Sequence, residues 1–322
     1  MDTSCDESCA AIVDSAGSRL LADVVYSHVA SMQKHGGIVP EIASREHLKA
    51  LPLAVEEALK KASLRYQDLD WIAVTNRPGL IGALLVGVSF AKGLAYQLRK
   101  PFSLVDHIEA HLFSPLLADL EGGTSPAFPW IALVVSGGHT ELFHVRSAVD
   151  FSHLGGTRDD AAGEAFDKIG KLLGLEYPAG PKIDKLVKEA GLDRKKLPIR
   201  FPRARLEGFD FSYSGLKTAV ALEVKKSNGV DKAAYATAAQ EAILDPLLEK
   251  ISLAQAQLGV QQVVVTGGVA CNSRLRDMLP NAYFPPSRHC SDNAAMIGLI
   301  AHLRNKSGHL IADSWTATAS AT

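Results

Sequence analysis

Three short apolar runs along the chain predict buried β-strands, and each of them leads into a turn. They cover residues 71–75, 130–135 and 262–266. Each run is rich in β-branched residues and lacks the alternation of a half-exposed strand, which is typical of a strand covered on both faces. The sequence therefore predicts a sheet built around strands that are buried in the protein.

Helical spacing of apolar residues marks the segments between these strands. Predicted helices cover residues 46–63, 80–98 and 233–258, and Pro246 is an unfavourable residue inside the last of them. Strands that alternate with helices favour an α/β architecture. The loop at 121–129, rich in glycine and proline, is a candidate boundary between two lobes, and a length of 322 residues also favours two domains.

Composition and charge exclude several classes of protein. With 34 basic and 35 acidic residues the net charge is −1, which excludes a globally basic nucleic-acid binder but not a local basic patch. A hydrophobic content of 47% excludes disorder over most of the chain. We expect no membrane span and no signal peptide, and we interpret Cys5, Cys9, Cys271 and Cys290 as reduced thiols of a cytoplasmic protein.

A histidine pair is the first candidate for chemistry. His107 and His111 are four residues apart, so on a helix they share one face and can bind one metal ion. Asp106 is a candidate helix cap or partner of a ligand. Glu109 would lie about 200° around the helix from His107, which argues against a zinc protease, where the glutamate lies beside the metal. The alternative is that both histidines are surface or core residues that share a helix face without binding a metal.

Paired glycines follow two of the predicted strands. Residues 136–140 follow the strand at 130–135, and residues 267–272 lead from the strand at 262–266 into a helix that begins near Ser273. Such turns let the backbone approach a phosphate closely, although tight turns also use glycine for steric reasons alone. Together with the polar residues 3–7, they favour a nucleotide site that is not a P-loop.

Two charged segments complete the candidates. Asp160, Glu164 and Asp167 fall at helical spacing and predict one acidic stripe, which could bind ribose hydroxyls or a metal, or could simply be solvated. The segment 194–205 has six cations and no acid, so it is either a phosphate-backbone contact or a solubilising loop. Its cations are Arg194, Lys195, Lys196, Arg200, Arg203 and Arg205.

Taken in order, these segments resemble the bacterial TsaD family, the threonylcarbamoyltransferases that modify adenosine 37 of tRNA. The matching stretches are 3–7, 36–41, 78–84, 107–111, 136–140, 159–168, 211–217, 267–272 and 291–293. The resemblance implies an actin/Hsp70/sugar-kinase-like fold with a nucleotide cleft between two α/β lobes. We expect lobes at 1–120, completed by a C-terminal helix at 292–310, and at 121–291.

The resemblance also implies the reaction and the residues that perform it. L-threonylcarbamoyl would pass from threonylcarbamoyl-AMP to N6 of adenosine 37, in tRNAs that read codons beginning with adenine. One divalent ion, iron before zinc, would be held by His107, His111 and Asp292. Asp6 and Glu7 are weaker candidates for proton handling. Substrate and nucleotide positions would fall on Val134, Val135, Ser136, Gly137, Gly138, Asp167, Gly180, Asp184 and Asn272.

Expected partners are tRNA, a TsaB-like paralogue and a TsaE-like ATPase, with helices of the N-terminal lobe as the docking surface. The alternatives are a metal-dependent glycoprotein endopeptidase, a non-catalytic scaffold of the same fold, and a small-molecule kinase. The chain departs from the family pattern near its start, where only Met1 and Asp2 precede Thr3, so we expect either a mis-assigned start or a short first strand. Arg77 stands where the family has glycine.

Overall fold

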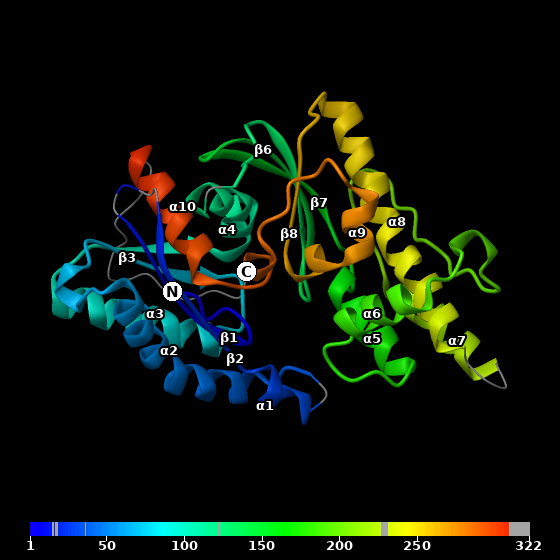
Figure 1. Cartoon of the computed structure of the whole chain (residues 1–322), viewed down its shortest axis with the longest axis horizontal. Coiled ribbons are helices and arrows are strands. Elements are labelled where there is room, and N and C mark those ends of the chain that lie inside the picture. Colours follow the sequence, from blue (N-terminus) through cyan, green and yellow to red (C-terminus); the bar gives the residue numbers. More distant parts are fainter. Residues whose placement is uncertain (15, 17–18, 36, 122, 227–230, 309–322) are drawn as a thin grey trace. The chain divides into compact units, whose positions relative to one another are not determined.

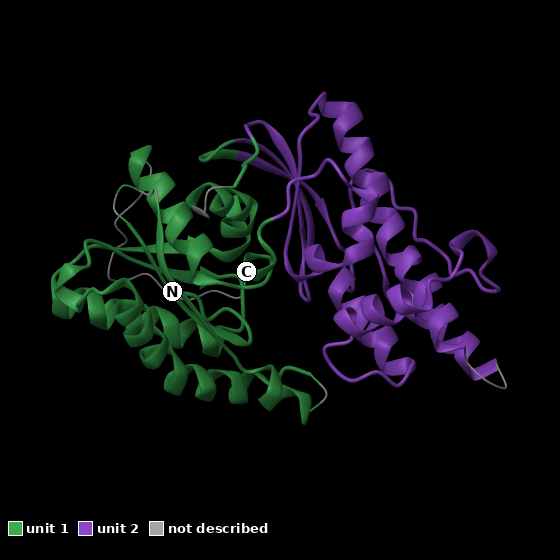
Figure 2. Ribbon diagram, in the orientation of Figure 1, with its two compact units in different colours: residues 1–126, 147–150, 285–322 green, residues 127–146, 151–284 purple. Residues whose placement is uncertain are grey.

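The computed structural model describes residues 1–14, 16, 19–35, 37–121, 123–226 and 231–308. The chain divides into two compact units, coloured separately in Figure 2. Unit 1 comprises residues 1–126, 147–150 and 285–322, and unit 2 comprises residues 127–146 and 151–284. Each unit combines strands and helices, which confirms the predicted α/β class.

Unit 1 contains two small sheets covered by helices. An antiparallel hairpin pairs β1 with β2, and β3 runs parallel to β4. Its elements, labelled in Figure 1, are β1 (Glu7–Val13), β2 (Leu20–Ser27), α1 (Val29–Gln33), α2 (Pro40–Ala62), η1 (Tyr66–Asp68), β3 (Ile72–Arg77), α3 (Ile81–Leu98), β4 (Phe102–Asp106), α4 (His107–Phe113), η2 (Ser114–Glu121), η5 (Ser287–His289) and α10 (Ala294–Lys306).

Helix α2 covers the hairpin because its apolar residues recur once per turn. Leu51, Val55 and Leu59 are buried and pack against Ala10 of β1 and Val24 of β2. This i, i+4, i+8 stripe is the spacing that places side chains on one helix face. The helix begins at Pro40, six residues before the predicted start, since proline suits the first turn of a helix.

The first two residues join the two sheets. Asp2 forms an isolated antiparallel bridge with Cys9 of β1, and the Met1 carbonyl accepts a hydrogen bond from the Thr75 N–H of β3. The expected short first strand is therefore reduced to this contact. It places Asp2 in the interior of unit 1, where its side chain is 1% exposed.

Helix α3 is the only element among the described residues that is long and apolar enough to cross a membrane. That single helix is weak evidence for a membrane segment, since a core helix of a water-soluble protein satisfies the same test. Ala91 and Ala95 on α3 lie in a buried cluster with Ile72 and Val74 of β3, and this packing explains its apolar composition.

Unit 2 is built on a four-stranded sheet in the order β7-β6-β5-β8. Strand β5 pairs antiparallel with β6 and parallel with β8. Every residue of β5 and β8 is buried, which confirms the predicted two-sided cover. The elements are β5 (Trp130–Val135), β6 (Thr140–Ser147), β7 (Asp150–Gly156), α5 (Ala162–Leu172), α6 (Gly180–Ala190), η3 (Arg194–Lys196), α7 (Ser214–Lys226), α8 (Lys232–Leu258), β8 (Val263–Thr266), η4 (Gly268–Cys271) and α9 (Ser273–Met278).

Candidate metal centre and substrate loops

Two histidines and one aspartate of unit 1 converge on a common point. His107 and His111 lie one turn apart on α4, and Asp292 immediately precedes the cap of α10. The Nε2 atoms of both histidines lie 3.3 Å from Asp292 Oδ1. All three ligand atoms are within 4.8 Å of one another, so the structure brings the predicted triad together.

Local helix capping fixes both elements that carry these ligands. Asp106 caps α4, as its carboxylate accepts hydrogen bonds from the N–H groups of Ile108 (2.9 Å) and Glu109 (3.1 Å). Asn293 caps α10 by accepting a hydrogen bond from the Met296 N–H at 3.0 Å. Because each ligand lies at or beside a capped helix start, its backbone is held by hydrogen bonds that close the first turn.

The separations between the ligand atoms suit a metal ion. Nitrogen and oxygen ligands bind zinc or iron at about 2.0–2.2 Å, so two ligands of one ion lie roughly 3.0–3.5 Å apart. Charge-assisted hydrogen bonds are shorter, at about 2.7–2.9 Å. The two 3.3 Å separations to Asp292 therefore fit shared coordination better than direct hydrogen bonding.

Burial and charge act against each other in this centre. Burial disfavours the charged form of His107, but the negative charges of Asp292 and Asp2 outweigh it and raise the pKa of His107 well above its ordinary value. Burial also opposes ionisation of Asp292, yet His107 holds the pKa of Asp292 well below its usual range. His111, buried beside another imidazole, has a lowered pKa. Asp292 thus carries a negative charge at neutral pH.

Asp2 and Ser4 support His107 from its other side. The sequence indicated Ser4 as part of the candidate segment 3–7, without this role, and gave no signal for Asp2. Asp2 Oδ2 and Ser4 Oγ each lie 3.2 Å from His107 Nδ1. A carboxylate on the second ring nitrogen fixes the tautomer and orientation of a ligating histidine. Asp2 is 105 positions away from His107 in the sequence, and no local pattern could have linked them.

The two candidate proton-handling residues are neighbours at the start of β1. Asp6 is 8% exposed and lies in the loop before β1, and Glu7 is the first residue of that strand. Burial, together with the negative charges of Asp292 and Asp6, raises the pKa of Glu7 to about 10. A cation in the centre would oppose that increase, because positive charge favours the ionised carboxylate.

Glu109 points away from the ligands, as its position on the helix predicted. Its carboxylate forms an ion pair with Arg304 of α10. A general base of a zinc protease has to reach the water beside the metal. Glu109 is held elsewhere, so the arrangement argues against the endopeptidase alternative.

The glycine turn after β5 is an exposed loop held at its base. Gly137 and Gly138 are exposed and have open space around them, while the Ser136 carbonyl accepts a hydrogen bond from Gly163 N–H of α5 at 3.1 Å. Val134 and Val135 are buried in β5 and position this turn. The loop therefore presents free backbone toward solvent at the carboxyl end of a buried strand, where nucleotide loops occur in α/β folds.

The remaining substrate candidates of unit 2 are joined by hydrogen bonds. Asp184 of α6 accepts bonds from the Ser273 N–H and hydroxyl, at 3.0 and 2.9 Å. The neighbouring Asn272 caps α9 through Leu275 N–H and donates to Gln240 Oε1, both at 3.0 Å. Asp167 accepts a hydrogen bond from the Ala179 N–H, directly before Gly180, at 2.7 Å. These contacts fix the loops that carry the candidates.

The expected acidic stripe is wrong in one respect. Asp160 precedes α5, which begins at Ala162, so it does not continue the helical face of Glu164 and Asp167. Lys168 forms ion pairs with Asp160 and Glu164. Of the three acidic residues, Asp167 is the one that contacts the loop before α6, through the Ala179 N–H.

The basic segment is partly neutralised by acids that the sequence pattern did not reveal. Arg194 pairs with Glu241 at 2.9 Å, and Arg203 pairs with Asp245 at 2.6 Å, both on α8. Lys196 forms an ion pair with Asp193 at 3.7 Å. Within the described part of the chain, Lys195, Arg200 and Arg205 are exposed and, unlike Arg194, Lys196 and Arg203, form no ion pair. These three are the cations available to an external phosphate.

Comparisons with known proteins point to one family. The TsaD family model, described as tRNA N6-adenosine threonylcarbamoyltransferase, matches residues 19–299. The protein of that name from Kosmotoga olearia is 44% identical over 321 residues, which cover 96% of this chain and 93% of that protein. Its counterpart from Syntrophus aciditrophicus is 47% identical over 319 residues, covering 95% and 92%.

A solved structure resembles the fold at low sequence identity. Full-length HypF in its phosphate- and nucleotide-bound form superposes with a TM-score of 0.59 at 14% identity. The match covers 91% of this chain and 53% of the HypF chain. The likeness concerns the fold alone, and it confirms the predicted actin/Hsp70/sugar-kinase-like class.

Proposed function

Because the chain belongs to the TsaD family of tRNA N6-adenosine threonylcarbamoyltransferases, we propose that His107, His111 and Asp292 hold one divalent ion that assists this reaction. Members of this family transfer a threonylcarbamoyl group to N6 of an adenosine in tRNA. The observation that carries the metal proposal is the convergence of three ligand atoms, two pairs of them 3.3 Å apart. Two histidines with one carboxylate favour ferrous iron, and zinc is the second candidate.

The reaction proposed is acyl transfer from threonylcarbamoyl-AMP to adenosine 37. The N6 nitrogen forms a bond to the carbamoyl carbon, the bond from that carbon to the phosphate oxygen breaks, AMP leaves, and the amine loses one proton. A bound ion would polarise a carbonyl or phosphate oxygen of the substrate. Asp6 and Glu7 are the candidates for accepting the proton. Glu7 feels the charge of Asp292, and a bound cation would favour the ionised form of Glu7 that can accept a proton.

Unit 2 supplies the proposed contacts to the adenylate. The exposed Gly137-Gly138 backbone would receive its phosphate, and Ser136 would fix that loop through Gly163. Asp167, Gly180, Asp184 and Asn272 would position the nucleotide, because their loops are tied together by hydrogen bonds. Positioning and charge stabilisation would then supply most of the rate increase, as the acyl-adenylate already has a good leaving group.

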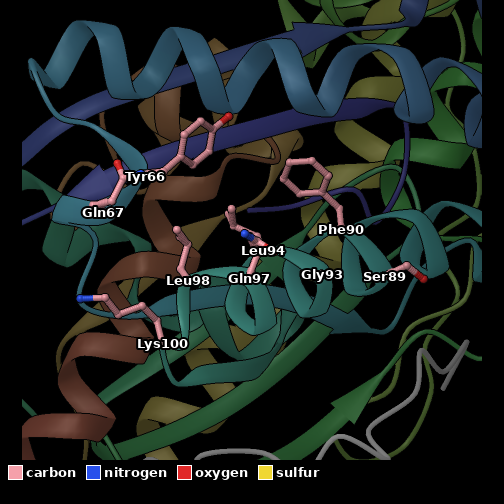
Figure 3. Close-up of a pocket in the computed structure, with 9 residues that line it drawn as sticks. All are labelled: Tyr66, Gln67, Ser89, Phe90, Gly93, Leu94, Gln97, Leu98 and Lys100. Atoms are coloured by element: carbon pink, nitrogen blue, oxygen red, sulfur yellow. The ribbon is translucent and has the colours of Figure 1, made fainter.

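The proposed partner surface is the outer face of α2 and α3. Leu48, Leu53, Leu85 and Tyr96 are exposed there. An adjoining pocket of about 690 Å³ is lined by residues of η1 and α3 and by Lys100. Phe90 and Leu94 are among its lining residues (Figure 3). Large exposed apolar surface marks an interaction site. We infer that a TsaB-like paralogue docks on this face, that a TsaE-like ATPase acts with the pair, and that the reaction is cytoplasmic.

Reconstitution tests the proposed function. The purified chain is incubated with tRNA, threonine, bicarbonate, ATP and the adenylate-forming enzyme, with and without TsaB-like and TsaE-like proteins, and tRNA nucleosides are then analysed. We expect N6-threonylcarbamoyladenosine in the complete mixture and its loss after chelation of the metal. Absence of the modified nucleoside in every arm, while a known relative succeeds under the same conditions, would reject the proposal.

The basic segment gives a separate prediction for tRNA binding. Replacing Lys195, Arg200 and Arg205 with alanine should raise the KM for tRNA by about tenfold or more and leave kcat unchanged. Each lost phosphate contact should also reduce the slope of log affinity against log salt by about 0.7–0.9. The matched control exchanges lysine and arginine at the same positions and keeps the charge. An unchanged salt slope in the alanine variant would show that tRNA binds elsewhere.

A further inference from the structure

A chain of three buried polar side chains lies in unit 1, outside the metal centre. Ser8 of β1 has its hydroxyl 2.9 Å from His28 Nε2 and 2.7 Å from His47 Nδ1. His28 follows β2, and His47 lies on α2. The second ring nitrogen of His47 is 3.1 Å from the Cys5 carbonyl. No local sequence motif links these three residues, and the proposed reaction has not used them.

The Cys5 carbonyl fixes the direction of this chain of hydrogen bonds. A carbonyl oxygen only accepts, so His47 Nε2 must carry the hydrogen. Burial lowers the pKa of both His47 and His28, and at neutral pH both rings are uncharged. His47 Nδ1 therefore accepts the Ser8 hydroxyl, and Ser8 in turn accepts from His28 Nε2–H. The donors run one way, from His28 through Ser8 and His47 to Cys5.

This series of hydrogen bonds ends at the Cys5 carbonyl, directly before the candidate carboxylates Asp6 and Glu7. The Cys5 carbonyl is held by His47, and the next carbonyl, of Asp6, accepts a hydrogen bond from the His28 N–H at 2.8 Å. The preceding carbonyl, of Ser4, accepts from Leu80 N–H at 2.9 Å. A Cβ atom at Gly79 would lie 2.5 Å from that oxygen, so only glycine permits this approach. Three consecutive carbonyls are thus fixed by other elements.

We propose that His47, supported by Ser8 and His28, is a positioning residue that holds Asp6 and Glu7 in place for threonylcarbamoyl transfer. This inference rests on the proposed function. A shift of about 1 Å in a catalytic group can reduce the rate about 100-fold. A buried donor on the Cys5 carbonyl restrains the backbone immediately before Asp6, and hydrogen bonds in a buried chain reinforce one another.

Two substitutions at His47 separate positioning from packing. His47→Gln keeps a side-chain N–H donor that can reach the Cys5 carbonyl, whereas His47→Leu fills the buried site without a donor. We expect His47→Leu to lower kcat about 100-fold, with KM values for tRNA and adenylate within about twofold and with metal content unchanged. His47→Gln should recover at least about tenfold of that loss. If His47 served only for packing, the leucine variant would have the higher kcat of the two, because leucine suits a buried apolar site better than glutamine.

A third variant covers the case in which His47→Leu does not fold. Ser8→Ala removes one oxygen atom and leaves both imidazoles, and we expect kcat to fall about tenfold in a variant that remains folded, with a melting temperature lowered because two buried ring nitrogens lose their partner. Wild-type activity of Ser8→Ala, or a His47→Leu variant as active as His47→Gln, would overturn the positioning proposal. An inactive wild-type chain would instead reject the proposed function, so the two failures are distinguishable.

Discussion

His111→Ala should abolish threonylcarbamoyl transfer while the chain remains folded. His111 supplies one of three ligand atoms, and its Nε2 lies 3.3 Å from Asp292 Oδ1. Loss of one ligand leaves two, so we expect the dialysed protein to lose its bound ion in elemental analysis. A metal ion contributes several kcal/mol to transition-state stabilisation, and each 1.4 kcal/mol is tenfold in rate, so formation of the modified nucleoside should fall at least about 100-fold.

Glu109→Gln is the matched control on the same helix. Glu109 pairs with Arg304 and faces away from the ligands, so this variant should keep its metal and most of its activity. Asp292→Asn, which preserves side-chain shape, should behave like His111→Ala if charge in the centre is required. Full metal content in both ligand variants would contradict the centre. A complete loss of transfer activity in Glu109→Gln would show that this variant cannot serve as a neutral control and that Glu109 takes part in the reaction.

The sequence predicted the strands whose hydrophobicity is continuous and missed strands whose conformation depends on pairing with a neighbouring strand. Every residue of β5 and β8 is buried, so these strands appear in the sequence as uninterrupted apolar runs. Strand β7 is mostly exposed or half-buried and contains Asp150, Ser152 and His153, which are not typical of a strand. Its conformation depends on pairing with β6, and such context outweighs intrinsic β-propensity.

The metal centre was predictable to different degrees for its different residues. The spacing of His107 and His111 indicated a shared helix face without other information. Asp292 lies 181 positions beyond His111 and came only from the family resemblance. Asp2, by contrast, gave no signal, because the backbone contacts of residues 1 and 2 with β1 and β3 bring its carboxylate beside His107. Contacts that depend on tertiary pairing leave no local pattern.

The ion pairs of the basic segment also depend on tertiary contacts that leave no local sequence pattern. Its six cations looked equivalent in the sequence, yet Arg194 and Arg203 face acids on α8. Glu241 and Asp245 are four residues apart and therefore share one helix face. Only the structure shows that this face lies against the basic loop. The sequence indicated a phosphate-binding surface but could not select Lys195, Arg200 and Arg205 from within it.

Gly267→Ala should be among the most damaging single substitutions in unit 2. Gly267 follows β8 with φ at +95°, where a side chain is strained. A Cβ atom there would lie 2.3 Å from the carbonyl oxygen of Val135, the last residue before the proposed phosphate loop. Strain and backbone displacement together should cost about 3 kcal/mol or more, which for a unit of this size lowers the melting temperature by roughly 6–12 °C.

Gly268→Ala is its neighbouring control, because a Cβ atom at Gly268 meets nothing within 4 Å. We expect that variant to melt within about 2 °C of the wild type, given that surface changes are usually within about 0.5 kcal/mol. Thermal unfolding followed by circular dichroism gives both values. The Gly267 variant should also lose adenylate affinity below its melting temperature, since displacement of Val135 moves Ser136 and the glycine turn. Equal melting temperatures for the two variants would show that β5 and the turn after β8 can separate without cost, and that this close approach does not hold the loop.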